Sequence, residues 1–235
     1  HLLEAAGKRI LLDCGMCQGS AEMEASNADP FPFDVESIDA LVVSHAHIDH
    51  VGRVPLLVKR GFRGPIFAQR ASAELMPIML MDSASLAESD AERFNRRRKH
   101  GEREMQPLYT REDVADAVEL LRPQPYDQRF RVLDGIEVAF RDAGHILGSS
   151  IVEVWADGRK LVFSGDLGPK GTPILRDPTP VREADLVLME STYGDRNHKD
   201  RAETIVELGE ILEQAWRDGG NVLIPAFAVG RSQEL

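Results

Sequence analysis

Short apolar runs alternate with amphipathic stretches over the first half of the chain. Residues 9–12, 40–44 and 66–68 are mainly apolar runs of strand length that end at polar residues. Residues 51–60 and 114–121 instead carry apolar positions at the spacing of an amphipathic helix. This alternation of strands and helices predicts a layered α/β architecture.

A longer helical stretch is predicted between these segments. Ser72 is the expected N-cap of a helix whose pattern Pro77 interrupts, because proline lacks the amide hydrogen that an interior position donates. A long helix is then expected over residues 78–100. The later helix at 114–121 is expected to end at the prolines that follow it.

The period of the apolar positions changes to two after residue 128, which predicts β-hairpins. Asp134-Gly135 and Asp157-Gly158 are dipeptides that favour tight hairpin turns. The four flanking strands are expected at 129–133, 136–140, 151–155 and 160–163.

The last part of the chain again mixes strands and helices. A buried strand is expected at 186–189, a helix at 202–217 that ends at Gly219-Gly220, and a strand at 222–224. Both ends of the chain fall inside expected elements, so we expect a piece of a longer protein.

The composition limits the classes of function. With 235 residues, 43% of them hydrophobic, the chain can bury one sizeable core. The net charge of −11 argues against a protein that coats nucleic acid through bulk charge, although a nuclease with metals and a few local arginines is still allowed. No apolar run approaches the ~20 residues that span a bilayer. We therefore expect a cytoplasmic protein with no membrane partner.

The two cysteines, Cys14 and Cys17, form a single C-x-x-C motif. One such pair does not complete a four-ligand zinc site, and a redox role needs a thioredoxin-like context that this sequence lacks. We expect both to be small buried or half-buried thiols.

A cluster of histidines directly follows the apolar run that ends at residue 44. His45 and His47 point the same way in an extended turn, because side chains at i and i+2 share a face. Asp49 and His50 then come around at the start of the next helix and can serve a neighbouring position. Imidazoles with a carboxylate favour zinc over manganese or iron. The alternative is a set of polar residues that cap a helix.

Two more candidate ligands stand next to glycines where strands end. His145 follows Gly144, and Asp166 follows Gly165; glycine lets the backbone or a ligand approach closely. Either residue alone could belong to a turn. Together with the histidine cluster they form a set of metal ligands.

Four motifs in order resemble the metallo-β-lactamase superfamily. They are L-L-D-C-G at 11–15, H-A-H-I-D-H at 45–50, G-H-I-L-G-S at 144–149 and S-G-D-L-G at 164–168. Two later motifs, E-S-T-Y-G at 190–194 and A-F-A-V-G-R-S-Q-E at 226–234, resemble the β-CASP branch, whose members cleave RNA or DNA. The similarity is to prokaryotic RNA-processing nucleases related to the eukaryotic mRNA 3′-end cleavage factor, and it covers essentially the whole chain.

The resemblance implies an α/β fold, the metallo-β-lactamase αββα sandwich in incomplete form, with the beginning of an inserted α/β β-CASP domain. Residues 1–194 would form the metallo-β-lactamase domain without its first strand and C-terminal return. Residues 195–235 would begin the β-CASP domain. Both ends would be truncated.

The resemblance also implies roles for individual residues. Asp13 would orient the histidine loop without binding metal, and Glu190 would partner a histidine that protonates the leaving group. That histidine, and another that completes the second zinc site, are expected beyond Leu235. The implied ligands are His45, His47 and His145 for one zinc ion, Asp49 and His50 for the other, and Asp166 as a bridge between the two.

The implied function is hydrolysis of RNA phosphodiester bonds, as an endonuclease or a 5′-exonuclease, by a hydroxide that two zinc ions share. Asp49 is suited to orient or deprotonate the nucleophile. The expected partners are single-stranded RNA and, in a homodimer, a second copy of the chain. The alternatives are a small-molecule hydrolase of the same fold, acting on thioesters or lactones, and a metal-binding fragment that cleaves nothing. The missing groups favour inactivity of the isolated chain.

Some residues have two open interpretations. Arg231 and Ser232 follow Gly230 where a strand gives way to a helix, a geometry that suits contact with a substrate phosphate but also an ion pair or a helix cap. The run Arg96-Arg97-Arg98-Lys99 either lies along RNA or forms a solvated helix face, and the second is favoured. Turn roles suffice for Ser149 and Ser150, and His1, His100 and His198 are not expected to bind metal.

Overall fold

The computed structural model describes residues 1–99, 103–197 and 199–234, and it divides the chain into two compact units. The first unit is His1–Met189 and the second is Glu190–Leu235. The predicted boundary after Gly194 lies a few residues further along the chain. The assignment of the second unit to a β-CASP domain stays a prediction.

The first unit contains a five-stranded sheet in the strand order β1-β2-β3-β4-β5. β1 and β2 are antiparallel, whereas the other neighbours are parallel. The strands are β1 (Leu2–Ala5), β2 (Lys8–Leu12), β3 (Ala40–Val42), β4 (Ile66–Gln69) and β5 (Leu121–Gln124). The sequence pattern did not predict β5, because Pro123 lies within it. Proline is tolerated there because β5 is an edge strand, where an amide hydrogen is not needed on the open side.

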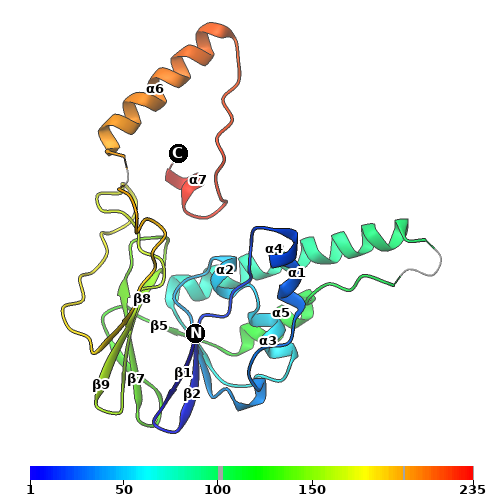
Figure 1. Cartoon of the computed structure of the whole chain (residues 1–235), viewed down its shortest axis with the longest axis vertical. Helices are drawn as coiled ribbons and strands as arrows, with labels where there is room; N and C mark the ends of the chain where they lie inside the picture. Colours follow the sequence, from blue (N-terminus) through cyan, green and yellow to red (C-terminus); the bar gives the residue numbers. More distant parts are fainter. Residues whose placement is uncertain (100–102, 198, 235) are drawn as a thin grey trace. The chain divides into compact units, whose positions relative to one another are not determined.

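Helices cover one face of this first sheet (Figure 1). Apolar side chains of the strands, such as Leu41 and Ile66, pack in one buried cluster with helical residues such as Leu57 and Leu80. The helices of the first unit are α1 (Ala21–Ala25), α2 (Ile48–Val51), α3 (Val54–Lys59), α4 (Arg70–Arg97) and α5 (Arg111–Glu119), with short 3₁₀ turns at Ser26–Ala28 and Val35–Ser37.

The prediction of one helix over residues 51–60 was wrong, because two helices occupy this stretch. α2 ends at Val51 and α3 begins at Val54, with Pro55 in its first turn. Proline favours the first turn of a helix, where its missing amide hydrogen would have no intrahelical acceptor. The break turns the chain directly after the histidine cluster.

The prediction that Pro77 interrupts the following helix was also wrong. α4 runs through Pro77 without a break, and Gln69 rather than Ser72 is its N-cap, with its side chain accepting the amide of Ala71. The buried side chains Met76 and Leu80 hold the helix against the core on both sides of the proline. This packing outweighs the loss of one backbone hydrogen bond.

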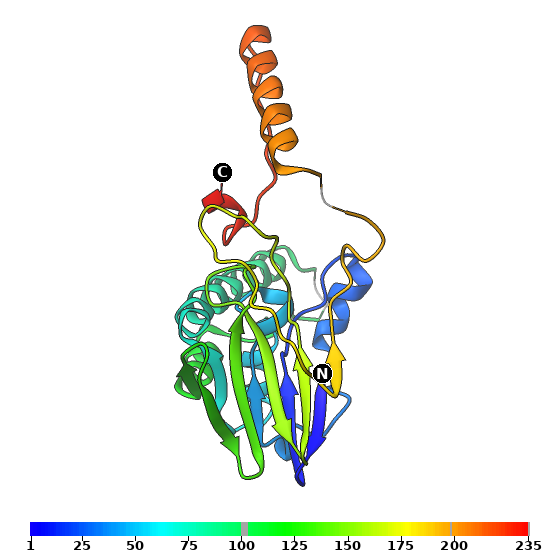
Figure 2. The same cartoon turned by 90° about the vertical axis from the view of Figure 1, so that its left-hand side faces the viewer.

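The second sheet has the strand order β10-β9-β8-β7-β6 and stands against the first (Figure 2). The two predicted hairpins, β6–β7 and β8–β9, are confirmed as antiparallel pairs. The predicted strand near 186–189 exists but is exposed rather than buried, with Leu186 53% and Val187 55% exposed. The strands are β6 (Arg129–Leu133), β7 (Ile136–Asp142), β8 (Ser150–Ala156), β9 (Arg159–Phe163) and β10 (Leu186–Leu188).

Alternation along β2 divides the core into two layers. Ile10 and Leu12 face the second sheet and pack in one cluster with Val138 and Phe140, whereas Leu11 faces the helices. The described part of the first unit is therefore a helix layer and two sheets, and none of its described helices covers the outer face of the second sheet. The α/β class is confirmed, in the incomplete form that was predicted.

The second unit contains α6 (Arg201–Asp218) and the short α7 (Arg231–Glu234). Asp200 caps the start of α6, and Gly219, with φ +63°, ends it in a left-handed conformation as the glycine pair predicted. The strand predicted at 222–224 is absent, since these residues pair with no other described strand. No described helix combines the length and apolar character that crossing a membrane requires.

Candidate metal centre

Two neighbouring parallel strands bring the first polar residues of the centre to one edge of the first sheet. β2 and β3 pair with Leu12 opposite Val42, so Asp13 and Ser44 emerge on the same side. The amide of Asp13 donates to the carbonyl of Val42 at 3.0 Å. Asp13 has φ +61°, a left-handed conformation that turns the chain away from the sheet directly after the strand.

The carboxylate of Asp13 holds the histidine loop. Its Oδ1 accepts the backbone N–H of Ser44 at 2.6 Å, and its Oδ2 accepts the Ser44 hydroxyl at 2.6 Å. The same Oδ2 lies 2.7 Å from Nδ1 of His50. These contacts give Asp13 the geometry that the predicted orienting role requires, because they fix both ends of the loop without exposing the carboxylate.

Ser44 is a buried residue that the sequence interpretation missed. Its hydroxyl lies 2.6 Å from Asp13 Oδ2 and 3.1 Å from Nδ1 of His45, and it is fully buried. The available signal was a polar residue between a buried strand and the first histidine. That signal is weak, because serine is common where strands end.

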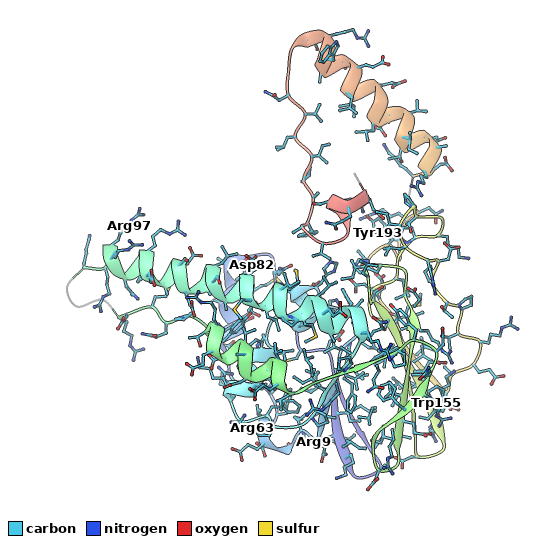
Figure 3. All side chains as sticks on the ribbon, turned by 180° about the vertical axis from the view of Figure 1, so that it is seen from behind. Arg9, Arg63, Asp82, Arg97, Trp155 and Tyr193 are labelled. Atoms are coloured by element: carbon cyan, nitrogen blue, oxygen red, sulfur yellow. The ribbon has the colours of Figure 1, made fainter. Side chains whose placement is uncertain are left out.

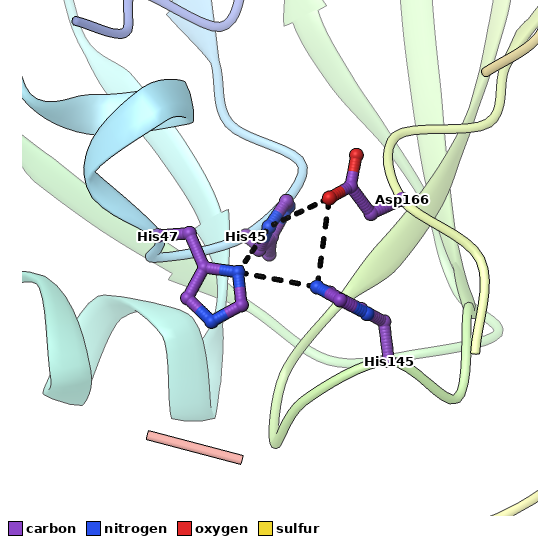
Figure 4. A group of neighbouring side chains, drawn as sticks. All are labelled: His45, His47, His145 and Asp166. Carbon is purple, nitrogen blue, oxygen red and sulfur yellow. Dashed lines mark hydrogen bonds and ion pairs between the residues drawn. The ribbon is translucent and has the colours of Figure 1, made fainter. Parts of the chain in front are cut away.

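Three imidazole nitrogens and one carboxylate oxygen converge on a common point (Figure 4). Nδ1 of His47 lies 3.0 Å from Nε2 of His45 and 3.1 Å from Nε2 of His145. Oδ2 of Asp166 lies 3.8 Å from Nε2 of His45 and 3.5 Å from Nε2 of His145. All four donor atoms lie within 4.8 Å of one another.

This arrangement fits a cation better than a set of hydrogen bonds. Nδ1 of His47 faces two imidazole nitrogens at hydrogen-bond distance, yet a ring nitrogen carries either one proton or one lone pair and cannot satisfy both neighbours. Nε2 of His47 is buried with no hydrogen-bond partner among the described residues. A divalent cation at the common point would accept all three lone pairs at once.

His145 reaches the centre from the loop between β7 and β8. The hydroxyl of Ser149 accepts the backbone amides of His145 and Ile146 at 3.0 and 3.2 Å. Gly144 has φ +66°, and a Cβ there would lie 2.6 Å from the Arg176 carbonyl oxygen. Ser149 therefore shapes the loop from below, which is the turn role expected of it, and Ser150 likewise donates its hydroxyl to the loop, at the carbonyl of Gly148.

Asp166 reaches the centre from the loop after β9, and glycines on each side fit it against the other loops. A Cβ on Gly165 would lie 2.8 Å from the Cβ of Ser44, and one on Gly168 would overlap the carbonyl of Gly144. Both glycines allow the close approach that the sequence predicted for these positions.

The two oxygens of Asp166 face two different groups of ligands. Oδ2 faces the group of His45, His47 and His145, whereas Oδ1 lies 3.2 Å from Nε2 of His50. Asp49 is at the open side, with Oδ2 3.7 Å from the same nitrogen. Asp49, His50 and Asp166 thus form a second group with donor atoms within 4.8 Å of one another. The imidazole and carboxylate donors of both groups suit a divalent metal ion.

Residues 1–225 match the family model of the Metallo-beta-lactamase superfamily. The chain belongs to this superfamily. The resemblance that the four motifs carried is therefore confirmed over nearly the full length, and the two groups of ligands lie where those motifs stand.

Curated relatives of this metallo-β-lactamase chain have names that refer to RNA. The "Ribonuclease TTHA0252" of Thermus thermophilus is 46% identical over 100% of this chain and 50% of its own length. The "RNase J-like protein" of Methanocaldococcus jannaschii is 30% identical over 99% of this chain and 49% of its own, and the "Cleavage and polyadenylation specificity factor 73" of Drosophila melanogaster is 30% identical over 100% and 32%. The chain spans half or less of the length of these relatives.

Burial and neighbouring charges divide the pKa values of the metallo-β-lactamase histidines. Burial, together with the nearby histidines, lowers the pKa of His45 well below its usual value, so this imidazole is neutral. Burial also lowers the pKa of His50, but hydrogen bonds to Asp13 and Asp166 outweigh it and raise the pKa to about 10. The same pair with His50 outweighs the effect of burial on Asp166 and lowers its pKa. Both oxygens of Asp166 therefore carry negative charge toward the ligand groups.

Three of the predicted site residues belong to the second unit and to neither ligand group. The side chain of Glu190 accepts the amide of Thr192 at 3.4 Å. Arg231 pairs with Glu234 at 3.2 Å, and the Ser232 hydroxyl donates to the carbonyl of Phe227 at 2.7 Å. The roles predicted for these residues stay predictions.

The remaining candidates lie outside both groups. Cys14 is buried, but Cys17 is exposed, so the expectation of a buried or half-buried thiol was wrong for Cys17. His1 is in neither ligand group and stacks edge-on against Phe163. His100 and His198 lie outside the described residues.

Proposed function

We propose that this chain is the metal-binding part of a ribonuclease that hydrolyses phosphodiester bonds of RNA with two zinc ions. The observation that carries the proposal is the divided carboxylate of Asp166, whose two oxygens face two separate groups of imidazole and carboxylate donors. A pair of metal ions that share a carboxylate is a common arrangement in enzymes that cleave phosphate esters. The names of the curated relatives support RNA as the substrate.

The proposed ligands divide as the geometry divides them. His45, His47 and His145 would hold one zinc ion, Asp49 and His50 would hold the other, and Asp166 would bind both. Zinc is favoured because imidazole nitrogen dominates the donor set. Bound there, the two ions would supply Lewis acidity toward the phosphate and make water a better nucleophile at neutral pH.

The residues around the ligands hold protons where the chemistry needs them. Asp13 accepts the proton of His50 Nδ1, which leaves Nε2 facing Asp166, and Ser44 does the same for His45. Asp49 is half exposed, and its carboxylate is not tied into the loop as that of Asp13 is. It is suited to orient the attacking water and accept its proton.

The resemblance to β-CASP nucleases supports a part for the second unit. Glu190 would partner the group that protonates the leaving oxygen, and Arg231 and Ser232 would contact a substrate phosphate. These assignments, like a homodimer and a preference for single-stranded RNA, rest on the sequence motifs alone.

The test is cleavage of labelled RNA by the protein with its complete natural chain, with and without Asp166→Ala. We expect Asp166→Ala to abolish metal-dependent cleavage, because the carboxylate supports both ions. The matched control is Asp116→Ala, which removes an exposed carboxylate from α5 and should leave cleavage unchanged. Two tightly bound zinc ions per chain in Asp166→Ala would refute the shared-ligand assignment.

A second assay separates the proposed function from hydrolysis of small molecules. The same preparations are given a glutathione thioester under the same conditions. Turnover of the thioester without cleavage of RNA would replace the ribonuclease by the small-molecule alternative. Zinc binding with turnover of neither substrate would leave a non-catalytic metal-binding protein.

A further inference from the structure

α4 connects the metal centre to a distant part of the surface. In its first turn, the buried Ser72 hydroxyl donates to the carbonyl of Gly148 at 2.8 Å, in the loop that carries His145. The helix has 28 residues, and at a rise of ~1.5 Å per residue its last turn, at Arg97, lies roughly 38 Å from Ser72. Its last buried residue is Ala91, and beyond it the helix extends past the rest of the first unit (Figure 3).

The end of α4 is held in a defined structure although it lies outside the core. The carboxamide of Asn95 donates to the Met105 carbonyl and accepts the Met105 amide, each at 2.9 Å. One turn earlier in the core direction, Glu88 accepts the amide and the Nε of Arg111, at 3.0 and 2.8 Å. The returning segment is therefore fastened to the helix at two levels.

This end of the helix carries a concentration of positive charge in an acidic protein. Residues 93–104 contain six basic and two acidic residues, whereas the chain as a whole has a net charge of −11. We call the six the basic tip: Arg93, Arg96, Arg97, Arg98, Lys99 and Arg103. All six are exposed.

Much of this charge is not neutralised by the tip's own acidic groups. Arg93 is paired with Asp90, but Arg96 and Arg97 form no ion pair within the described part of the chain. Arg93 and Arg97 are four positions apart on the helix, and like charges at this spacing repel one another. The tip therefore costs some helix stability unless an anionic partner binds there.

An exposed aromatic ring adjoins these charges. Phe94 is 44% exposed and stands one residue after Arg93 on the last turns of α4. Cations that track phosphates, together with an aromatic side chain on which a base stacks, are the usual features of sites for single-stranded nucleic acid.

We propose that the basic tip binds the backbone of a single-stranded RNA whose scissile phosphate lies at the metal centre. The inference rests on the proposed ribonuclease function and adds a second contact on the substrate, at the far end of α4. Only an RNA long enough to span the roughly 38 Å along α4 reaches both places. The enzyme should therefore bind long RNA more tightly than short RNA, with the difference arising at the tip.

The test is the double variant Arg96→Ala/Arg97→Ala in the complete natural chain, measured by fluorescence anisotropy with a labelled long oligouridylate and with a uridine dinucleotide. We expect affinity for the long RNA to fall about tenfold and the slope of log affinity against log salt to become shallower by about 1.4, because ~0.7 counterions are released per phosphate contact. Affinity for the dinucleotide should not change. The matched control, Arg131→Ala/Arg159→Ala, removes two exposed arginines from the second sheet and should leave both affinities unchanged.

A second variant separates stacking from charge. Phe94→Ala should lower affinity for long RNA several-fold without changing the salt slope, because stacking releases no counterions. Unchanged affinity and slope in the double arginine variant would overturn the proposal, as would an equal loss in the control pair, which would indicate bulk charge. Anisotropy needs no catalysis, so RNA binding at the tip without cleavage would sink the proposed function and keep this inference, whereas cleavage without any effect of the tip would do the reverse.

Discussion

The hydroxyl of Ser44 lies 2.6 Å from Oδ2 of Asp13 and 3.1 Å from Nδ1 of His45. A hydroxyl has one proton, and the short contact with a carboxylate assigns that proton to Asp13. The Ser44 oxygen is then left to accept from Nδ1 of His45. Nε2 of His45 therefore carries its lone pair toward His47 and Asp166, in the tautomer that binds a metal ion.

Ser44→Ala should weaken metal binding without removing any ligand. Loss of the hydroxyl frees the tautomer of His45 and one of the contacts that hold Asp13, and such changes behind a ligand typically lower metal affinity ~10–100-fold. Zinc affinity is measured by competition with a chromophoric chelator. Ser83→Ala is the control, because it breaks a hydrogen bond with Tyr109, worth about 1 kcal/mol, outside both ligand groups. Equal zinc affinities in the two variants would contradict the role of Ser44.

Gly168→Ala should displace His145 from the first group. The added Cβ would overlap the carbonyl of Gly144, next to His145, so one of the two loops must move. We expect a loss of about 1–3 kcal/mol in the free energy of unfolding, together with weaker zinc binding.

Thermal unfolding and zinc titration measure the two effects. Gly209→Ala is the matched control, because its Cβ would meet nothing within 4 Å and alanine favours the helix. Native zinc affinity in Gly168→Ala would show that the loop of His145 does not depend on this close approach.

Thiol labelling should distinguish the two cysteines. Burial raises the pKa of Cys14 to about 12, so at about pH 8 this thiol is protonated as well as inaccessible, whereas Cys17 is exposed. We expect one label per folded chain and two per chain in denaturant, with peptide mapping that identifies Cys17 in the folded case. Rapid labelling of Cys14 in the folded protein would contradict its burial.

The same pKa sets the sign of a stability effect at high pH. The folded-state pKa of Cys14 lies above the model value of 9.0, so its contribution to stability is complete below about pH 9 and declines as the pH rises toward about 12. Cys14→Ala should therefore lose less stability than the parent chain between these pH values, as urea unfolding measures. An identical decline in both would remove Cys14 from the cause.

The parts of the fold that were predicted well depend on neighbours in the sequence. The hairpins of the second sheet follow from period-two alternation and the Asp-Gly turns, and α6 follows from helical spacing and the glycines after it. The elements predicted wrongly depend on distant partners. α4 passes through Pro77 because the core holds the helix on both sides, and β5 contains Pro123 because β4 provides its only described neighbour.

The sequence alone determined the donor types and the strand ends that carry them, because metal chemistry selects imidazole and carboxylate and strands are read from local alternation. Only the tertiary structure decided that the two oxygens of Asp166 face different groups, that Ser44 fixes His45, and that Gly168 meets the loop of His145. The physical reason is that local spacing restricts side chains only a few residues apart. Atoms from four loops meet only when the register of two sheets and the packing between them are set.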